Sequence, residues 1–159
     1  LKNIIELTLK GKKEINCDYI DVISFDLDGN DLFLVDELLK NNFKPKLFIV
    51  EYNGKFPPPI QWRMNYNEKH IWDGSDYYGA SLASFNELFV NNDYELICCN
   101  AHTGSNAFFI KKEYLKLFDD VPKNIEDIYV PPRYFLHNVF GSHSFSHPQS
   151  VKTINKLFE

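Results

Sequence analysis

The sequence has few of the residues that stabilise small secreted proteins or cross membranes. It contains only three cysteines, which is too few for a disulfide framework and typical of a reducing compartment. No apolar run approaches the roughly 20 residues that a membrane-spanning helix needs. A signal-peptide pattern is also lacking. These absences predict a cytoplasmic protein without a membrane span.

An excess of positive charge is missing as well. The chain has 17 Lys and Arg against 22 Asp and Glu, a net charge of −5, with the two signs interspersed. Such a surface does not suit the phosphates of a nucleic acid, so no nucleic-acid partner is expected. Apolar residues are abundant, at 44%, and 16% of the chain is aromatic. This composition predicts one cored domain over residues 1–159 and excludes a disordered chain.

The order of the predicted elements indicates an α/β fold. Hydrophobic periodicity predicts these elements in turn: a helix over 3–10 closed by a basic turn at 10–13, a strand over 19–25, a helix over 31–42, a strand over 46–50, a long loop over 54–78, a helix over 81–92, and strands over 94–100 and 107–111. We therefore expect a partial Rossmann-like sheet flanked by helices. It would contain a βαβ unit, a further helix and a closing antiparallel pair whose strands reverse direction. The core would span about 18–115, and residues 119–159 would form an irregular extension that ends in a short helix.

The most informative stretch is an apolar strand that ends in a cluster of acids. Its sequence, Val-Ile-Ser-Phe-Asp-Leu-Asp-Gly-Asn-Asp, runs over residues 22–31. Clustered carboxylates repel one another, and their presence at the end of a strand is typical of a site that handles a metal, a cofactor or a proton. The next strand also ends in polar residues, Glu51 and Asn53. Parallel strands would bring Asp26 and Glu51 together at one edge of the sheet.

One chemistry that fits the acid cluster is that of a haloacid-dehalogenase-type phosphohydrolase. Asp26 would then be the nucleophile and Asp28 the general acid. The sequence departs from that family at Asn30, where Thr or Val is usual. Its next strand ends in Glu51 in place of Ser or Thr. The later acid pair of that family has no strand before it here, since Asp119 and Asp120 have the pattern of a turn.

The chain resembles more extensively the carboxyl-terminal half of class I S-adenosylmethionine-dependent methyltransferases, in the FkbM-like branch. Four stretches over roughly 18–115 carry the resemblance: ISFDLDGND at 23–31, FIVEYN at 48–53, IWDGSDYYGAS at 71–81, and CN at 99–100 through NAFFI at 106–110. The resemblance implies strands four and five, the next helix and the closing strand pair of that fold. It also implies methyl transfer to an oxygen of a sugar or other small metabolite.

The resemblance also indicates what these residues do not include. The glycine-rich turn and the ribose-binding acid of that fold have no counterpart before Asp26, and the chain begins at Leu1 with a helical pattern that lacks a cap. We therefore expect the carboxyl-terminal portion of an enzyme, inactive alone and weak in binding S-adenosylmethionine. A hypothesis from another class is a non-catalytic binding or assembly module built on half of this fold.

Asp26 and Asp28 are the predicted catalytic residues, which would position the acceptor or remove its proton. Glu51 and Asn53 would assist at the rim of the site. Asp26, Glu51 and Asn53 together would offer oxygen ligands to Mg²⁺ or Ca²⁺, as in metal-dependent O-methyltransferases. The alternative is that Glu51 and Asn53 only cap neighbouring backbone groups.

Two further segments carry residues with possible chemistry. Trp72 and Tyr77 in the long loop are predicted rim residues of a lid over the acceptor or cofactor, with covering of the sheet edge as the alternative. Three histidines at 137, 143 and 147 have no spacing typical of a zinc site, and we interpret them as part of a loop.

Overall fold

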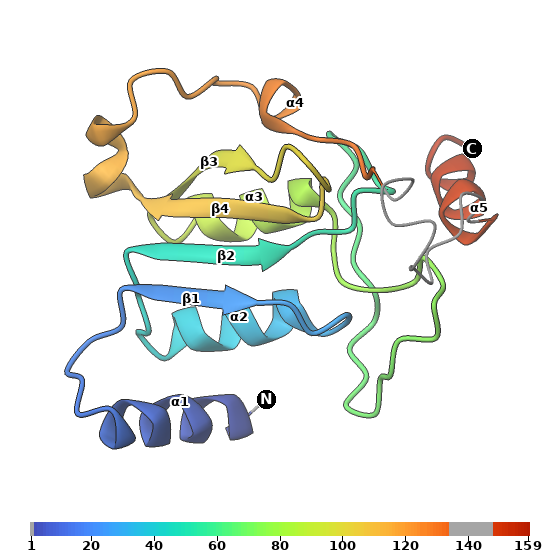
Figure 1. Ribbon diagram of the computed structural model, residues 1–159. Helices are drawn as coiled ribbons and strands as arrows, with labels where there is room; N and C mark the ends of the chain where they lie inside the picture. The colour runs from blue at the N-terminus through green and yellow to red at the C-terminus, as the bar shows by residue number, and fades with distance from the viewer. Residues whose placement is uncertain (1, 134–147) are drawn as a thin grey trace.

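A computed structural model describes residues 2–133 and 148–159 of the chain, and it has an α/β architecture. Four strands form one mixed sheet in the order β1-β2-β4-β3 (Figure 1). The strands are β1 (Val22–Phe25), β2 (Leu47–Glu51), β3 (Tyr94–Cys99) and β4 (Asn106–Lys111). No helix of the described residues is long and apolar enough to cross a membrane.

The strand pairings confirm most of the predicted directions. β1 and β2 are adjacent and parallel, with Phe25 opposite Val50. β4 is antiparallel to both β2 and β3 and lies between them. The predicted closing antiparallel pair is present, because β4 is antiparallel to β3; of its two strands only β4 runs against β1 and β2, and β3 runs in the same direction as they do. Consequently three of the four strands have their carboxyl ends at the same edge.

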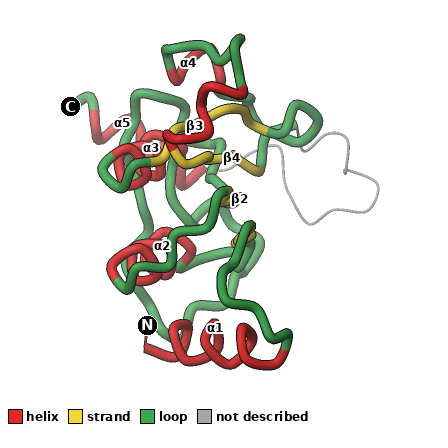
Figure 2. The backbone as a smooth tube through the Cα atoms, turned by 90° about the vertical axis from the view of Figure 1, so that its left-hand side faces the viewer, coloured by secondary structure: helices red, strands yellow, loops and turns green. Residues whose placement is uncertain are grey.

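The helix that follows β1 and the helix that follows β2 pack on one side of the sheet. They are α2 (Asp31–Lys40) and α3 (Leu82–Val90), and both lie to the left of the strands in Figure 2. No described helix lies over the centre of the other side in this view. On that open side Val22 is 50% exposed, and Ile49 and Phe108 are only partly buried. The alternation of side chains therefore gives the sheet one buried face and one accessible face.

Aromatic and aliphatic side chains fill the space between the sheet and its helices. Phe89 of α3 stacks on Phe109 of β4 with ring centroids 4.2 Å apart, and it also contacts Phe48 of β2 at 5.1 Å. The predicted apolar stripe of α2 is buried, with Val35 fully inaccessible and Leu38 1% exposed. Burial of these side chains is the main force that fixes the positions of the strand ends.

Helix α1 (Lys2–Glu14) is longer than predicted. The basic turn expected at 10–13 is instead the last turn of this helix. Gly11 is tolerated there although glycine costs a helix about 1 kcal/mol. Positive charge near the carboxyl end of a helix is favourable. Lys10 Nζ also lies 3.7 Å from Glu14 Oε1, one turn later in the helix.

The first turn of α3 is capped by a different residue from the one that the sequence pattern favours. The Ser84-x-x-Glu87 pattern near the start of the helix predicted over 81–92 is typical of a capping box, in which Ser84 would be the N-cap. In the structure Ser81 is the N-cap, and its Oγ accepts the N–H of Ser84 at 3.2 Å. The same Oγ accepts the N–H of Trp62 at 3.0 Å, so Ser81 also attaches the long loop to the helix.

The segment after the sheet contains three helical elements among the described residues, and the second and third of them lie within the extension predicted over 119–159. It includes η1 (Lys112–Leu117), α4 (Ile125–Ile128) and α5 (Pro148–Leu157), the last of which agrees with the predicted short terminal helix. α4 contributes Ile125 and Ile128 to the edge of the core. The three histidines at 137, 143 and 147 lie outside the described residues.

The replacement Ser81→Ala should lower the free energy of unfolding by about 1–2 kcal/mol. The buried hydroxyl satisfies two backbone N–H groups, and alanine leaves both without an acceptor. Urea unfolding followed by circular dichroism measures this change. Glu87→Gln is the matched control, since Glu87 is exposed and would matter only in the predicted capping box. An equal loss of unfolding free energy in Ser81→Ala and Glu87→Gln would contradict the assignment of Ser81 as the N-cap.

Candidate functional site

Three carboxylates meet at the edge of the sheet where β1 and β2 end. Oxygen atoms of Asp26, Asp28 and Glu51 all lie within 4.8 Å of one another. The parallel pairing places the ends of β1 and β2 side by side. Phe25 and Val50 point into the core, so the next residue of each strand, Asp26 or Glu51, points to the open side. The predicted meeting of the two strand ends is therefore present, with Asp28 as a third member.

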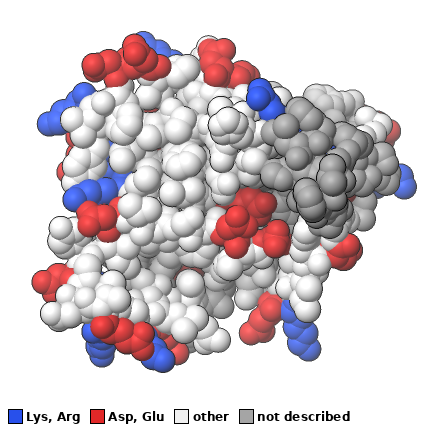
Figure 3. All heavy atoms as spheres, in the orientation of Figure 1, with Lys and Arg blue, Asp and Glu red and all other residues white. Residues whose placement is uncertain are grey.

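The cluster lies on the accessible face of the molecule. Figure 3 is drawn in the orientation of Figure 1, and it shows acidic atoms gathered in the region where β1 and β2 end. Asp26 is exposed, whereas Asp28 and Glu51 are partly buried. A small molecule therefore has access to the oxygens of the cluster from this side.

The turn after β1 is built to hold Asp28 in an unusual conformation. Asp28 has a φ of +51°, a value that few residues other than glycine adopt readily. The buried carboxylate of Asp31 accepts the backbone N–H groups of Leu27 at 2.9 Å and Gly29 at 3.0 Å. These two hydrogen bonds close the turn. Asp31 therefore holds the turn before α2, whereas the N-cap residue Asn30 forms no side-chain cap hydrogen bond.

The long loop reinforces the same turn from outside. His70 Nε2 lies 3.1 Å from the carbonyl oxygen of Asp28 and must donate to it, because a carbonyl only accepts. Asn30 and Asn67 exchange two hydrogen bonds, of 2.7 and 3.1 Å. A Cβ at Gly29 would lie 2.4 Å from the His70 ring, so only glycine allows this approach. We call His70, Asn67, Asn30 and Gly29 the turn clamp.

Burial and mutual repulsion change the acidity of the cluster. The pKa of Glu51 rises from 4.5 to about 8, chiefly because burial disfavours its charged form and secondly because of the charges of Asp26 and Asp28. Burial and then the charge of Asp28 raise the pKa of Asp26 as well. Glu51 therefore carries a proton at neutral pH in the free protein. The cluster can bind or release a proton near physiological pH.

Among the described residues no ion pair balances the carboxylates of the cluster. The ion pairs among the described residues join Lys10 to Glu14, Lys40 to Asp36, Lys46 to Asp21 and Lys111 to Glu113, so none involves the cluster. Unpaired like charges this close are costly. Oxygen ligands of this type are those that Mg²⁺ and Ca²⁺ prefer.

Asn53 has a different place from the one predicted for a metal ligand. Its side chain is fully buried, and its Nδ2 donates to the carbonyl oxygens of Asp76 and Tyr78, both at 2.9 Å. Its Oδ1 accepts the N–H of Lys55 at 3.1 Å. These bonds fit the alternative role of capping backbone groups, because they fix the return of the long loop. We therefore replace Asn53 by Asp28 in the set of candidate ligands.

Trp72 and Tyr77 are engaged within the long loop itself. The indole of Trp72 donates to the carbonyl of Ser75 at 2.7 Å, and the hydroxyl of Tyr77 accepts the N–H of Asn65 at 3.1 Å. Tyr77 also meets the ring of Trp62 edge to face at 5.6 Å. These contacts stabilise the loop that carries His70. His70 is thus the loop residue that the structure brings against the cluster.

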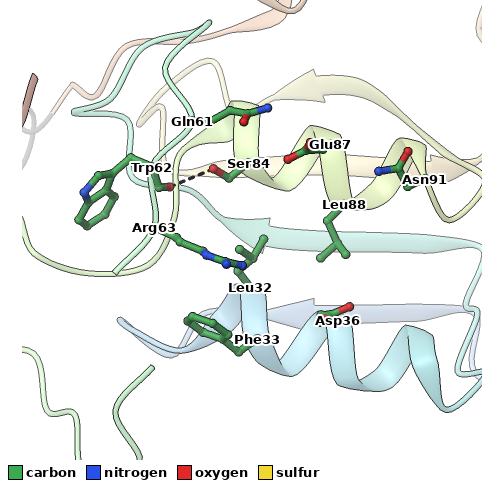
Figure 4. A pocket seen from close by; sticks show the side chains of 10 residues that line it. All are labelled: Leu32, Phe33, Asp36, Gln61, Trp62, Arg63, Ser84, Glu87, Leu88 and Asn91. Carbon is green, nitrogen blue, oxygen red and sulfur yellow. Dashed lines mark hydrogen bonds between the residues drawn. The ribbon is translucent and has the colours of Figure 1, made fainter. Parts of the chain in front are cut away.

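A separate cavity of about 420 Å³ lies between α2 and α3 (Figure 4). Arg63 extends over it with its guanidinium 5.3 Å from the ring of Phe33, and Ser84 donates to the carbonyl of Trp62 at 3.1 Å. These contacts hold the strap formed by residues 61–63 on the helices. The cavity lies on the helix-covered side, whereas the carboxylates face the open side, so it is not part of the cluster.

Sequence reasoning did not single out Asn67, Arg63 or the buried Asp76. Their partners lie many positions away in the chain, so no local spacing marks them. No family model, curated protein or solved structure matches this chain. Function must therefore be inferred from the geometry of the site.

The replacement Gly29→Ala should lower the free energy of unfolding by roughly 1–3 kcal/mol, because the new methyl group would overlap the His70 ring. Removing that ring in the double variant Gly29→Ala/His70→Ala should restore part of the loss. A double-mutant cycle from urea unfolding measures the coupling. Strict additivity of the two changes would show that His70 does not pack on this turn.

Stability should fall as the pH rises from about 4.5 to about 8. Glu51 binds its proton more tightly in the folded chain, so its contribution is fully present below pH 4.5 and is lost as the pH approaches 8. The variant Glu51→Gln cannot ionise and should lose this part of the pH dependence. Urea unfolding at pH 5, 7 and 9 compares the two proteins, with Glu68→Gln as an exposed control. Identical profiles for wild type and Glu51→Gln would contradict the raised pKa.

Proposed function

We propose that this chain is the acceptor-binding, carboxyl-terminal part of an S-adenosylmethionine-dependent O-methyltransferase. The observation that carries the proposal is the meeting of Asp26, Asp28 and Glu51 at the carboxyl ends of two adjacent parallel strands. Ligands of open α/β sheets bind at this edge. The acceptor is a hydroxyl group of a sugar or another small metabolite.

The strand arrangement supports this assignment. The parallel pair β1 and β2 corresponds to the positions that the sequence resemblance gives to strands four and five, and β3 and β4 to the closing pair. Helix α3 follows β2 after the long loop, as the resemblance requires. In this proposal the glycine-rich turn that holds S-adenosylmethionine is supplied by sequence outside these 159 residues.

Asp26 is the group best placed to remove the acceptor's proton. It is the most exposed member of the cluster, and its raised pKa makes it a better base than an ordinary carboxylate. The acceptor oxygen forms a bond to the methyl carbon while the bond from sulfur to that carbon breaks, and the hydroxyl proton passes to Asp26. Asp28, held by the turn clamp, orients the hydroxyl.

The cluster also fits a divalent cation. Its three carboxylates have oxygens within 4.8 Å of one another and no cationic partner among the described side chains. Asp26, Asp28 and Glu51 would hold Mg²⁺ or Ca²⁺. When bound, the cation would lower the pKa of the acceptor hydroxyl. Glu51 would lose its proton on binding, since a carboxylate ligand must be ionised.

A phosphohydrolase using Asp26 and Asp28 is less well supported. β2 ends in Glu51, where that chemistry needs a hydroxyl residue. β4 is antiparallel to β2, so it leaves the sheet at the edge where β2 begins, and η1 follows at once. Asp119 and Asp120 come just after η1 in an exposed turn. They therefore do not supply a second acid pair from the end of a strand parallel to β1.

In the full natural chain, Asp26→Asn should reduce methyl transfer by on the order of a hundredfold or more. The amide keeps the shape of the side chain but is neither a base nor a good metal ligand. The measurement is transfer of labelled methyl groups from S-adenosylmethionine to hydroxyl acceptors. Asp119→Asn, an exposed carboxylate remote from the cluster, is the matched control and should keep full activity.

A phosphatase assay on the same proteins separates the two chemistries. We expect no turnover of a generic phosphate ester with Mg²⁺. The opposite pattern, in which phosphatase activity is lost in Asp26→Asn and the wild type transfers no methyl group, would overturn the proposed function.

A further inference from the structure

A second cavity lies at the opposite edge of the sheet from the carboxylates, where β1 and β2 begin. Its volume is about 490 Å³, within the range of small-molecule sites. Among the described residues four lysines line it, Lys12, Lys44, Lys46 and Lys111, together with one acid, Asp18. We call it the lysine cavity. Such a concentration of positive charge is unexpected in a chain with a net charge of −5.

Separate segments of the chain build the lysine cavity. Lys12 comes from the last turn of α1, Lys44 and Lys46 from the connection between α2 and β2, and Lys111 from the end of β4. Lys46 and Lys111 are neighbours because β2 pairs with β4. The N–H of Lys111 donates to the carbonyl of Lys46 at 3.0 Å. In Figure 3 basic atoms lie at the left edge, where β2 begins in the orientation of Figure 1.

The lining also contains apolar and aromatic residues. Ile23, Phe43 and Pro45 contribute apolar groups, and two aromatic rings, Tyr19 and Tyr114, complete the wall. The ammonium of Lys46 lies 5.5 Å from the centre of the Tyr19 ring. The cavity therefore offers an apolar and aromatic surface beside several positive charges.

The positive charges of the lysine cavity are only partly balanced. Lys46 pairs with Asp21 at 2.6 Å, with both side chains exposed, and an exposed ion pair contributes little. Lys111, which is partly buried, pairs with the exposed Glu113 at 3.6 Å. Lys12 donates to the backbone carbonyl of Asp18. Lys44 is exposed and forms no ion pair with a described residue. Lys12 and Lys44 thus have ammonium charge available for an anion.

We propose that the lysine cavity binds a nucleotide or a similar phosphorylated ring compound. The phosphates contact Lys12 and Lys44 through charge-assisted hydrogen bonds, which are stronger than those between neutral groups. The ring lies on the apolar surface between Tyr19 and Tyr114, where stacking is favourable. This site is independent of the proposed methyl transfer, since it uses none of the clustered carboxylates.

The test is isothermal titration calorimetry of the 159-residue chain with ATP. The buffer contains EDTA, and the titration is done at low and at physiological ionic strength. EDTA removes divalent cations, so the carboxylate cluster cannot contribute. We expect saturable binding that weakens as salt increases. The variant Lys12→Gln/Lys44→Gln should bind on the order of tenfold or more weakly. Lys69→Gln/Lys152→Gln removes the same charge at exposed positions elsewhere and should bind as the wild type does.

Two further measurements make the result decisive. Lys44→Gln alone removes no side-chain hydrogen bond within the described part of the chain. A loss of ATP binding in this variant therefore supports the site even if the Lys12 change disturbs the fold. Tripolyphosphate should bind more weakly than ATP, because it has no ring. The proposal is overturned by the absence of saturable ATP binding at low salt, by equal losses in the two double variants, or by tripolyphosphate binding as tightly as ATP.

Discussion

Mutual repulsion among Asp26, Asp28 and Glu51 is the constraint on which the site depends. Three acids with oxygens within 4.8 Å of one another do not stay together unless the backbone holds them. The parallel pairing of β1 and β2 fixes Asp26 and Glu51, and the closed turn with the turn clamp fixes Asp28. The packed core behind the strands provides the rigidity. Burial first and this repulsion second raise the pKa of Glu51 to about 8, so it carries a proton at neutral pH.

The long loop over residues 54–78 connects the fold to the site. Asn53 fixes its return through two backbone carbonyls, Ser81 ties its middle to α3, and His70 rests on Gly29 beside the acids. Its aromatic residues pack among themselves and keep this geometry in place. The loop therefore acts in our proposal as a support for Asp28, and an acceptor hydroxyl would meet carboxylates that are already positioned.

Much of this arrangement follows from the sequence, because strand ends are marked by an abrupt change from apolar to polar residues. That change located Asp26 and Glu51, and parallel pairing then made them neighbours. Asn53 was misjudged because its partners lie 23 and 25 residues away, beyond any local pattern. The insertion of β4 between β2 and β3 pairs β4 with a strand far away in the chain, and hydrophobic periodicity, which is local, does not indicate it.

The most direct test of the account is titration of the Glu51 side-chain carboxyl by carbon-detected NMR, with and without Ca²⁺. The account predicts a pKa near 8 in the free protein, because Glu51 is buried beside two other acids. Added Ca²⁺ should lower that pKa, since the cation stabilises the ionised form. In Asp26→Asn the pKa of Glu51 should fall and the effect of Ca²⁺ should weaken. A Glu51 that titrates near 4.5 and does not respond to Ca²⁺ would contradict the claim that these acids form one site.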